Sequence, residues 1–323
     1  MKNIGVFTSG GDAPGMNACV RAVVRSGLSL GLNVYGIKYG YNGMISGDIY
    51  QMESHSVSNI LQRGGTILKS ARSEEFRTKE GRKKAYDQLK KREIEGLVVI
   101  GGDGSFTGAN IFHEEYGIPA VGAPGTIDND LFGSDSTIGF DTAVNTALNA
   151  IDKIRDTANS HDRVFFIEVM GRHSGYIAIH CGIGGGAELV MVPETSTTIQ
   201  DVIDTLNKGR DKEKTSAIVI VAEGDEQGNA IEIANKVMER LPKLDIRVST
   251  LGHLQRGGAP TSYDRILATR LGLAAVEGLI DGKSNVMAGI VNSEVVYTSF
   301  KLAISKSKPI NSELMRLVEV MNT

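Results

Sequence analysis

Two carboxylates, Asp128 and Asp130, stand two residues apart in the motif Pro-Gly-Thr-Ile-Asp-Asn-Asp at residues 124–130. The motif follows a short apolar run at residues 118–122, and the hydroxyl of Thr126 precedes both acids. Carboxylates beside flexible glycines suit a metal ion, a phosphate chain and a hydroxyl that must lose its proton. The motif therefore predicts a site of phosphoryl chemistry.

A second acid-bearing turn, Gly-Gly-Asp-Gly-Ser at residues 101–105, follows the apolar run 97–100. In one interpretation Asp103 holds Mg²⁺, while Ser105 and the start of a helix face phosphates. In the alternative interpretation Asp103 only caps the helix. In open α/β sheets ligands bind at the carboxyl ends of the strands. We therefore expect this turn and the 124–130 motif at the same edge of a sheet.

A third glycine-rich turn, Ser-Gly-Gly-Asp-Ala-Pro-Gly at residues 9–15, runs from a predicted strand to a predicted helix. Such turns let backbone N–H groups approach a phosphate, and the helix N-terminus adds partial positive charge. The Gly-Lys-Ser/Thr of a Walker A motif is missing. A tight turn without a ligand remains the alternative.

Arginines near glycines are candidates for phosphate contacts, because their forks match phosphate oxygens in pairs. These are Arg72, Arg77, Arg82, Arg163, Arg172, Arg247 and Arg256. Arg92 and Arg240 are interpreted as surface residues. The run Gly-Ile-Gly-Gly-Gly-Ala at residues 182–187 fits a dinucleotide pattern only weakly, and we predict a turn there.

Bulk properties exclude several classes of protein. The chain has 323 residues, 41% of them hydrophobic, and a formal net charge of −3, so nothing favours nucleic acid or an anionic membrane as a partner. Cys19 and Cys181 are the only cysteines, which fits a reducing compartment better than a disulfide scaffold. No apolar run approaches the roughly 20 residues of a membrane helix, and we expect a cytoplasmic protein.

Short apolar runs alternate with amphipathic stretches, the pattern of parallel sheets with helices on both faces. We predict an α/β fold with two Rossmann-like, three-layer αβα lobes and mostly parallel sheets. The predicted strands are 4–7, 34–37, 97–100, 120–122, 164–169, 189–192, 217–222, 247–250 and 288–291. The predicted helices include 16–31, 56–61, 79–91, 137–157, 173–182, 199–208, 230–241 and 262–277.

The three turns, with Met-Gly-Arg at 170–172 and Gly-His-Leu-Gln-Arg-Gly-Gly at 252–258, occur in an order that closely resembles bacterial ATP-dependent 6-phosphofructokinases. The resemblance extends over residues 1 to 300. It implies transfer of the γ-phosphate of MgATP to the 1-hydroxyl of fructose 6-phosphate, the committed step of glycolysis. It also implies a homotetramer whose active sites are shared between subunits. We expect residues 1–139 with 256–303 to form an ATP-binding lobe and residues 140–255 with 304–323 to form a fructose 6-phosphate-binding lobe.

The resemblance assigns residues to each ligand. It places ATP against Gly11, Tyr41, Arg72, Ser73, Arg77, Gly102, Asp103, Gly104, Ser105 and Gly108, with Mg²⁺ on Asp103. It places the sugar phosphate against Thr126, Ile127, Asp128, Asp130, Met170, Gly171, Arg172, Glu223, His253, Leu254, Gln255 and Arg256, with Arg163 and Arg247 reaching a neighbouring subunit. Asp128 is the implied base, and Arg72, Arg172, Thr126 and the Gly11 N–H group are implied to stabilise the transferring group.

The identity of the phosphoryl donor depends on two glycines. Pyrophosphate-using relatives carry Asp in place of Gly104 and Lys in place of Gly125, so the two glycines favour ATP over pyrophosphate. A non-catalytic sugar-phosphate or nucleotide sensor is a further alternative, disfavoured because Asp103, Asp128 and Asp130 are all present. A Rossmann dehydrogenase is a last alternative. It would need a Gly-x-Gly-x-x-Gly turn after its first strand, which Ser-Gly-Gly-Asp at residues 9–12 does not supply.

A regulatory site is implied less completely. Residues matching the family's allosteric nucleotide site are Arg21, Arg25, Arg155, Gly186, Glu188, Lys212 and Lys214, with ADP and phosphoenolpyruvate as the expected effectors. Ser54 stands where well-regulated members carry Arg, and His55 and Asn59 also depart from the family pattern. Loss of an arginine weakens phosphate capture, so we expect blunted regulation.

Overall fold

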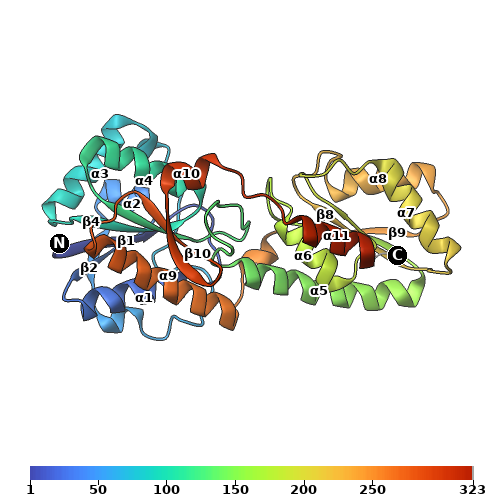
Figure 1. The fold of residues 1–323 in the computed structure, drawn as a ribbon, viewed down its shortest axis with the longest axis horizontal. Coiled ribbons are helices and arrows are strands. Elements are labelled where there is room, and N and C mark those ends of the chain that lie inside the picture. The colour runs from blue at the N-terminus through green and yellow to red at the C-terminus, as the bar shows by residue number, and fades with distance from the viewer. Residues whose placement is uncertain (322–323) are drawn as a thin grey trace. The chain divides into compact units, whose positions relative to one another are not determined.

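The computed structural model describes residues 1–321, which form two compact units. Unit 1 consists of Met1–Ile127, Leu131–Thr142 and Arg256–Lys308. Unit 2 consists of Asp128–Asp130, Ala143–Gln255 and the residues from Pro309 onward. Figure 1 shows a sheet and its covering helices within each unit. The predicted α/β class with mostly parallel sheets is confirmed.

Unit 1 is built on a seven-stranded sheet of order β11-β10-β5-β4-β1-β2-β3. The strands are β1 (Asn3–Thr8), β2 (Asn33–Ile37), β3 (Ile49–Met52), β4 (Gly96–Gly101), β5 (Ala120–Pro124), β10 (Val286–Val291) and β11 (Glu294–Ser299). The five central strands are parallel, and the two edge strands β3 and β11 pair antiparallel. Every residue of β1 and β4 is buried, which explains the apolar runs 4–7 and 97–100 within these strands.

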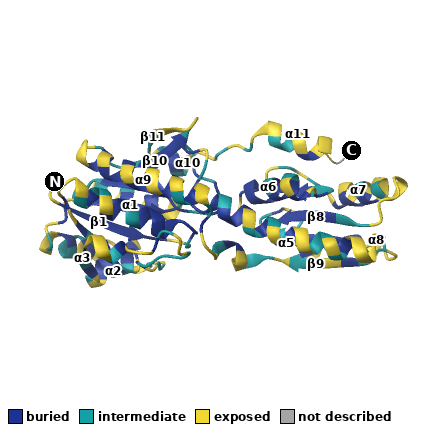
Figure 2. Cartoon of the chain, turned by 90° about the horizontal axis from the view of Figure 1, so that it is seen from below, coloured by how far each residue is buried: buried dark blue, intermediate teal, exposed yellow. Residues whose placement is uncertain are grey.

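Helices cover both faces of this sheet. On one face α1 (Met16–Ser29) packs against α9 (Ser262–Ile280). On the other face the helices α2 (Tyr41–Ser46), α3 (Lys79–Lys91), α4 (Asp103–Tyr116) and α10 (Phe300–Ser305) enclose an aromatic core that contains Phe7, Phe106 and Phe300. Figure 2 shows buried and exposed residues alternating along α1 and α9. The sheet is thus the rigid middle layer that holds the turns at its edge.

Unit 2 has a four-stranded parallel sheet of order β7-β8-β6-β9. Its strands are β6 (Val164–Val169), β7 (Leu189–Met191), β8 (Ala217–Ala222) and β9 (Ile246–Thr250). Its helices are α5 (Phe140–His161), whose first residues belong to unit 1, α6 (Tyr176–Gly185), α7 (Ile199–Asp211), α8 (Ala230–Arg240) and α11 (Ser312–Met321). Side chains of α7 and α8 form a core with the sheet. Within residues 1–321, no helix has the length and apolarity needed to cross a membrane.

Two local predictions were wrong. The stretch 56–61 is not a helix: a single 3₁₀ turn, Ser54–Val57, ends before Asn59, whose backbone is left-handed at φ 56°. Residues 182–185 are not a turn but the last turn of α6, which Gly186 ends at φ 62°. A glycine in the left-handed region is a common helix stop, so the glycines mark the end of α6 and not a phosphate loop.

Candidate active site

Three glycine-rich turns lie side by side at one edge of the unit 1 sheet. They follow β1, β4 and β5, which are adjacent parallel strands. The Ser9 N–H group donates to the Ile100 carbonyl at 3.0 Å, and the Gly125 N–H group donates to the Gly101 carbonyl at 3.0 Å. The three strands therefore end level with one another, and residues 9–15, 101–105 and 124–127 of unit 1 meet at one edge of its sheet.

The first turn combines an uncapped helix start with a guanidinium. Gly15, at φ 106°, precedes α1 and supplies no side-chain cap, so the first N–H groups of the helix have no capping side chain. The Arg256 guanidinium lies against Gly11, since a Cβ on that glycine would be 2.0 Å from Nη1. Arg256 Nη1 donates to the Asp12 carbonyl at 3.3 Å, while its buried Nε has no hydrogen-bond partner among residues 1–321. This corner is suited to an anion.

The second turn places one acid at the start of α4. Gly102 is the N-cap and Asp103 is the first helical residue, with an exposed side chain, so Asp103 is not the cap. Ser105 is buried between the turns: its Oγ would lie 2.4 Å from a Cβ on Gly101. A Cβ on Gly104 would meet no atom within 4 Å. The space beside Asp103 is therefore open.

A single exposed carboxylate beside glycine-rich turns fits Mg²⁺, which is usually held by one or two carboxylates together with substrate phosphates and water. Within residues 1–321 no group of three or more His, Cys, Asp or Glu side chains is placed to hold a metal by itself. Asp103 is therefore suited to a metal ion that arrives with a phosphate chain.

An aromatic side chain supports the second turn. Tyr41 is buried, stacks on Phe76 with ring centroids 3.9 Å apart, and donates its hydroxyl to the Ser105 carbonyl at 2.5 Å. A Cβ on Gly108 would lie 2.9 Å from the Tyr41 ring, so the glycine lets the ring approach α4. Burial raises the pKa of Tyr41 far above its ordinary value, and the phenol stays a hydrogen-bond donor.

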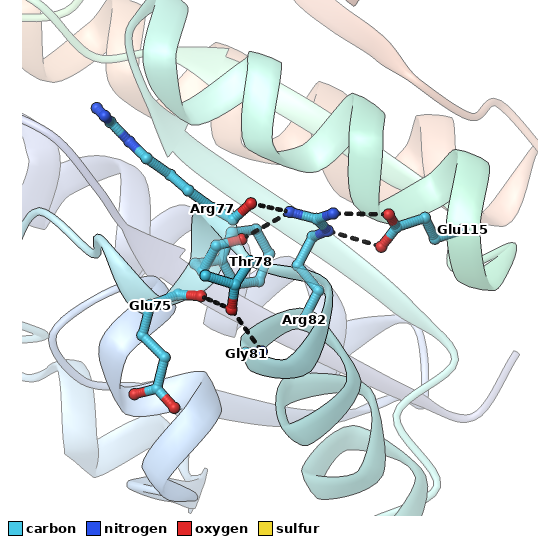
Figure 3. A network of polar contacts seen from close by, with 7 residues as sticks. Glu75, Arg77, Thr78, Gly81, Arg82 and Glu115 are labelled. Atoms are coloured by element: carbon cyan, nitrogen blue, oxygen red, sulfur yellow. Dashed lines mark hydrogen bonds and ion pairs between the residues drawn. The ribbon is translucent and has the colours of Figure 1, made fainter.

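The buried Arg82, paired with Glu115, fixes the loop that carries the predicted ATP-binding residues Arg72, Ser73 and Arg77. Figure 3 shows Arg82 donating from Nη1 to the Arg77 carbonyl at 2.7 Å and, through Nε and Nη2, to both oxygens of Glu115 at 2.6 and 2.7 Å. These bonds keep the pKa of the Glu115 carboxyl below its ordinary value. The expectation that Arg82 contacts phosphate is thus wrong, because Glu115 and backbone carbonyls occupy its guanidinium.

The side chains of Arg72 and Arg77 remain exposed at the loop surface. The Arg72 carbonyl accepts a hydrogen bond from Asn42 at 3.0 Å, and Arg77 is 3.3 Å from Glu74 in a solvent-exposed pair. Ser73 Oγ accepts from the Phe76 N–H group at 3.2 Å. The backbone of this loop is therefore fixed while both guanidinium groups face solvent.

In unit 2 an arginine lies beside a buried acid. Asp128 is 3% exposed, and its Oδ2 is 3.5 Å from the Nε of Arg172, whose side chain is 44% exposed. Arg172 follows the carboxyl end of β6 in the left-handed region at φ 53°. The preceding Gly171 has φ 144°, and a Cβ there would be 2.3 Å from the Ser174 carbonyl. The local backbone thus directs Arg172 toward Asp128.

Two residues predicted to bind the sugar phosphate make hydrogen bonds to this turn. Glu223 Oε1 accepts from the N–H groups of Gly171 and Arg172 at 3.3 and 2.8 Å. Gln255 is fully buried, accepts from the Met170 N–H group at 3.4 Å and donates to the Gly252 carbonyl at 3.1 Å. Their side chains hold the backbone of the 170–172 motif in place.

The remaining predicted sugar-phosphate residues differ in exposure. Thr126 and Asp130 are half-buried, Ile127 and Met170 are buried, and His253 and Leu254 are exposed.

Arg163 and Arg247 lie at the amino-terminal ends of the unit 2 strands, whereas Arg172 follows the carboxyl end of β6. Arg163 precedes β6, and both arginines bind Asp245, at 2.7 Å from Arg163 Nε and 2.9 Å from Arg247 Nη1. Hydrogen bonding to Arg163 keeps the pKa of Asp245 below its ordinary value. At about 3.3 Å per residue, the length of β6 separates them from Arg172 by roughly 20 Å. Within one chain the structure does not bring these arginines to Asp128.

The predicted effector residues are divided between the units. Arg21 and Arg25 lie on α1 of unit 1. In unit 2, Arg155 donates to the carbonyls of Gly185 and Gly186, and Glu188 accepts from the Ile218 N–H group at 2.7 Å. Lys212 and Lys214 are exposed after α7. Arg155 and Glu188 therefore bind backbone groups within their own unit.

Some residues that shape the site were not found from the sequence. Asn17 is buried in α1, donates to the carbonyls of Arg63 and Gly64 at 3.1 Å each, and accepts from the Ile67 N–H group at 2.7 Å. It fixes the segment that runs along the first turn. The sequence signal for Asn17 was an amide side chain among the apolar residues of a predicted helix, a pattern that indicates a buried polar contact.

Residues 3–279 match the family described as Phosphofructokinase. The chain belongs to the phosphofructokinase family. It is 62% identical to an ATP-dependent 6-phosphofructokinase of Cytophaga hutchinsonii over 322 residues, 100% of this chain and 98% of that protein. It is 58% identical to ATP-dependent 6-phosphofructokinase 1 of Thermus thermophilus, covering 99% of both chains.

Solved phosphofructokinase structures share the fold. The Saccharomyces cerevisiae phosphofructokinase matches with a TM-score of 0.88 and 35% identity, over 99% of this chain and 46% of the longer yeast chain. A pyrophosphate-dependent phosphofructokinase of Marinobacter aquaeolei matches with a TM-score of 0.85 over 100% of this chain and 92% of that one. At 22% identity, this second likeness concerns the fold alone.

Proposed function

We infer that the protein transfers the γ-phosphoryl group of ATP to the 1-hydroxyl of fructose 6-phosphate, giving fructose 1,6-bisphosphate and ADP. The observation that carries this inference is the 62% identity to an ATP-dependent 6-phosphofructokinase over essentially the whole of both chains. The anion-binding turns of unit 1 and the Asp128–Arg172 pair of unit 2 supply the side chains that the reaction needs.

We assign ATP to unit 1. The uncapped N-terminus of α1, the Gly11 N–H group and the exposed Arg72 and Arg77 are suited to its phosphates. Asp103 would hold Mg²⁺, which neutralises phosphate charge when bound. Ser105, Tyr41 and Gly108 shape the start of α4 around this position.

The chemical step uses few groups of the chain. Asp128 accepts the proton of the sugar 1-hydroxyl, and such general-base assistance is typically worth about 10²–10⁴ in rate. Arg172 lies beside Asp128 and, with Arg72, Thr126 and the Gly11 N–H group, stabilises charge on the transferring phosphoryl group. Asp130, His253 and Arg256 are assigned to the sugar phosphate.

Two glycines favour ATP as the donor. A Cβ on Gly104 meets no atom within 4 Å, so the residue leaves room beside Asp103 for the α-phosphate of a nucleotide. At Gly125 a Cβ would lie 3.1 Å from both Ile100 and Met16, so a larger side chain is crowded there. A carboxylate at the first position would repel a nucleotide phosphate, and a lysine at the second would suit a smaller donor.

We propose a homotetramer in which Arg163 and Arg247 serve the sugar phosphate of a neighbouring subunit. Both arginines lie at the far edge of their own sheet, which supports a role outside their own chain. We propose that regulation by ADP or phosphoenolpyruvate is blunted, because Ser54 supplies no guanidinium. Strongly sigmoidal fructose 6-phosphate kinetics relieved by ADP would contradict blunted regulation.

The deciding experiment measures fructose 1,6-bisphosphate formation from fructose 6-phosphate and Mg²⁺, with ATP and pyrophosphate as parallel donors. We expect turnover with ATP alone. Turnover with pyrophosphate alone would show that Gly104 and Gly125 do not decide the donor. Absence of turnover with both donors would overturn the inference and favour a sugar-phosphate or nucleotide sensor.

A further inference from the structure

The side chain of Asp264, on α9, is completely buried in unit 1. Its Oδ1 accepts from the Gly139 N–H group at 2.9 Å, and its Oδ2 accepts from the Thr142 N–H and hydroxyl groups at 2.8 and 2.5 Å. The Thr142 hydroxyl in turn accepts from the Thr261 N–H group at 3.0 Å. One carboxylate thus satisfies the start of α5 from a helix more than 100 residues away in the sequence.

The segment that Asp264 holds is tied to the third turn of the site. The Thr137 hydroxyl donates to the Thr126 carbonyl at 2.6 Å, and the Ile138 N–H group donates to the Pro124 carbonyl at 2.8 Å. Residues 137–142 therefore connect Asp264 to the backbone of Thr126. A shift of this segment would move the third turn.

The same segment supports the first turn. A Cβ on Gly15 would lie 2.7 Å from Ile138 and 3.6 Å from Asp264, and a Cβ on Gly139 would lie 2.7 Å from the Cβ of Ala13. The glycines permit close contact between the first turn and the segment before α5. The turns that carry Gly11 and Thr126 thus rest on one piece of backbone whose anchor is Asp264.

We propose that Asp264 is a positioning residue that sets the Thr126 turn against the Gly11 turn for phosphoryl transfer. The inference rests on the proposed function. Burial raises the pKa of Asp264, although hydrogen bonds from Thr142 and Gly139 oppose the shift. Burying an acid is unfavourable for folding. Its presence at position 264 is explained if correct placement of the two turns matters more for function than this loss of stability.

The test compares two variants of α9 in the full-length protein. Asp264→Asn keeps the shape but turns an amide NH₂ toward backbone N–H groups, so we expect the 137–142 segment to move. Misplacement by about 1 Å can cost 10²-fold in rate, so we expect kcat to fall by one to two orders of magnitude with little change in KM for either substrate. The control is Leu271→Ala, which removes a buried side chain two turns along the same helix. It should lower the melting temperature while kcat is kept.

A wild-type kcat in Asp264→Asn, at a melting temperature lowered as in the control, would show that Asp264 is only structural and overturn the inference. If Asp264→Asn does not fold, Thr142→Val is judged by the same comparison; it removes the hydroxyl that donates to Asp264 and accepts from the Thr261 N–H group. Wild-type protein is assayed in parallel: an inactive wild type refutes the proposed function, whereas an active wild type with an equally active variant refutes the role of Asp264 alone.

Discussion

The Nε atom of Arg172 lies 3.5 Å from Oδ2 of Asp128, so a half-exposed guanidinium is held beside a carboxylate that is 3% exposed. The arginine reaches this position because its own backbone and that of Gly171 adopt positive φ angles. The pair places a candidate base beside a guanidinium suited to phosphate charge, an arrangement that fits phosphoryl transfer to a hydroxyl.

Replacing the candidate base should separate chemistry from binding. In Asp128→Ser we expect turnover to fall by about 10²–10⁴, because proton removal from the sugar hydroxyl loses its acceptor. Binding of fructose 6-phosphate, measured by calorimetry, should survive. Turnover close to that of the wild type would show that another group is the base.

The arginines at the far edge of unit 2 should affect binding more than turnover. Arg163→Ser and Arg247→Ser are each expected to raise KM for fructose 6-phosphate with a smaller change in kcat, since both are assigned to its phosphate. Arg240→Ser is a matched control, because Arg240 is exposed and donates to Gln200 Oε1 at 3.2 Å. A loss confined to kcat would contradict the binding role.

The donor argument can be tested at Gly104, where an added Cβ meets no neighbour within 4 Å. Gly104→Asp should fold normally and raise KM for ATP by about 10-fold or more, because a carboxylate close to a phosphate costs upward of 1.4 kcal/mol. Gly104→Ala adds a Cβ without charge and should keep wild-type kinetics. Equal effects of the two substitutions would point to bulk or backbone freedom in place of charge.

The buried carboxyl of Asp264 gives a pH prediction. Because burial raises its pKa in the folded state, the group favours folding while protonated, and that contribution is lost as pH rises through the folded pKa. The reference is Asp264→Asn, which has no charge to gain. Relative to this variant, the melting temperature of the wild type should fall as the pH rises above about 4, the ordinary pKa of an aspartate. A constant difference above this pH would show that the carboxyl pKa is not raised.

The turns of the site could be predicted from the sequence because each follows an apolar run, and parallel strands end at one edge. The edge strands β3 and β11 were missed because they are short or half-exposed, so neither shows a continuous apolar run. Short helices such as α2 and α10 fell below the length at which periodicity is visible.

Long-range polar pairs could not be predicted in the same way. Arg82 had the same local signal as Arg77, a basic residue near a glycine, yet only the fold brings Glu115 to its guanidinium. Asp245 binds both Arg163 and Arg247, although nothing in the local sequence distinguishes it from a surface acid. Such pairs depend on which elements pack together, and local sequence patterns do not show that packing.

The position of Arg163 and Arg247 at the far edge of their sheet has a genetic consequence if they serve a neighbouring subunit. A cell that carries one intact and one arginine-deficient copy of the gene would build mixed assemblies. In these, an intact chain would lose substrate affinity through the defect of its neighbour, so the deficient allele would be partly dominant. Conversely, two defective chains could complement each other when they are expressed together. If one lacks the base and the other lacks these arginines, a mixed assembly could contain one working site.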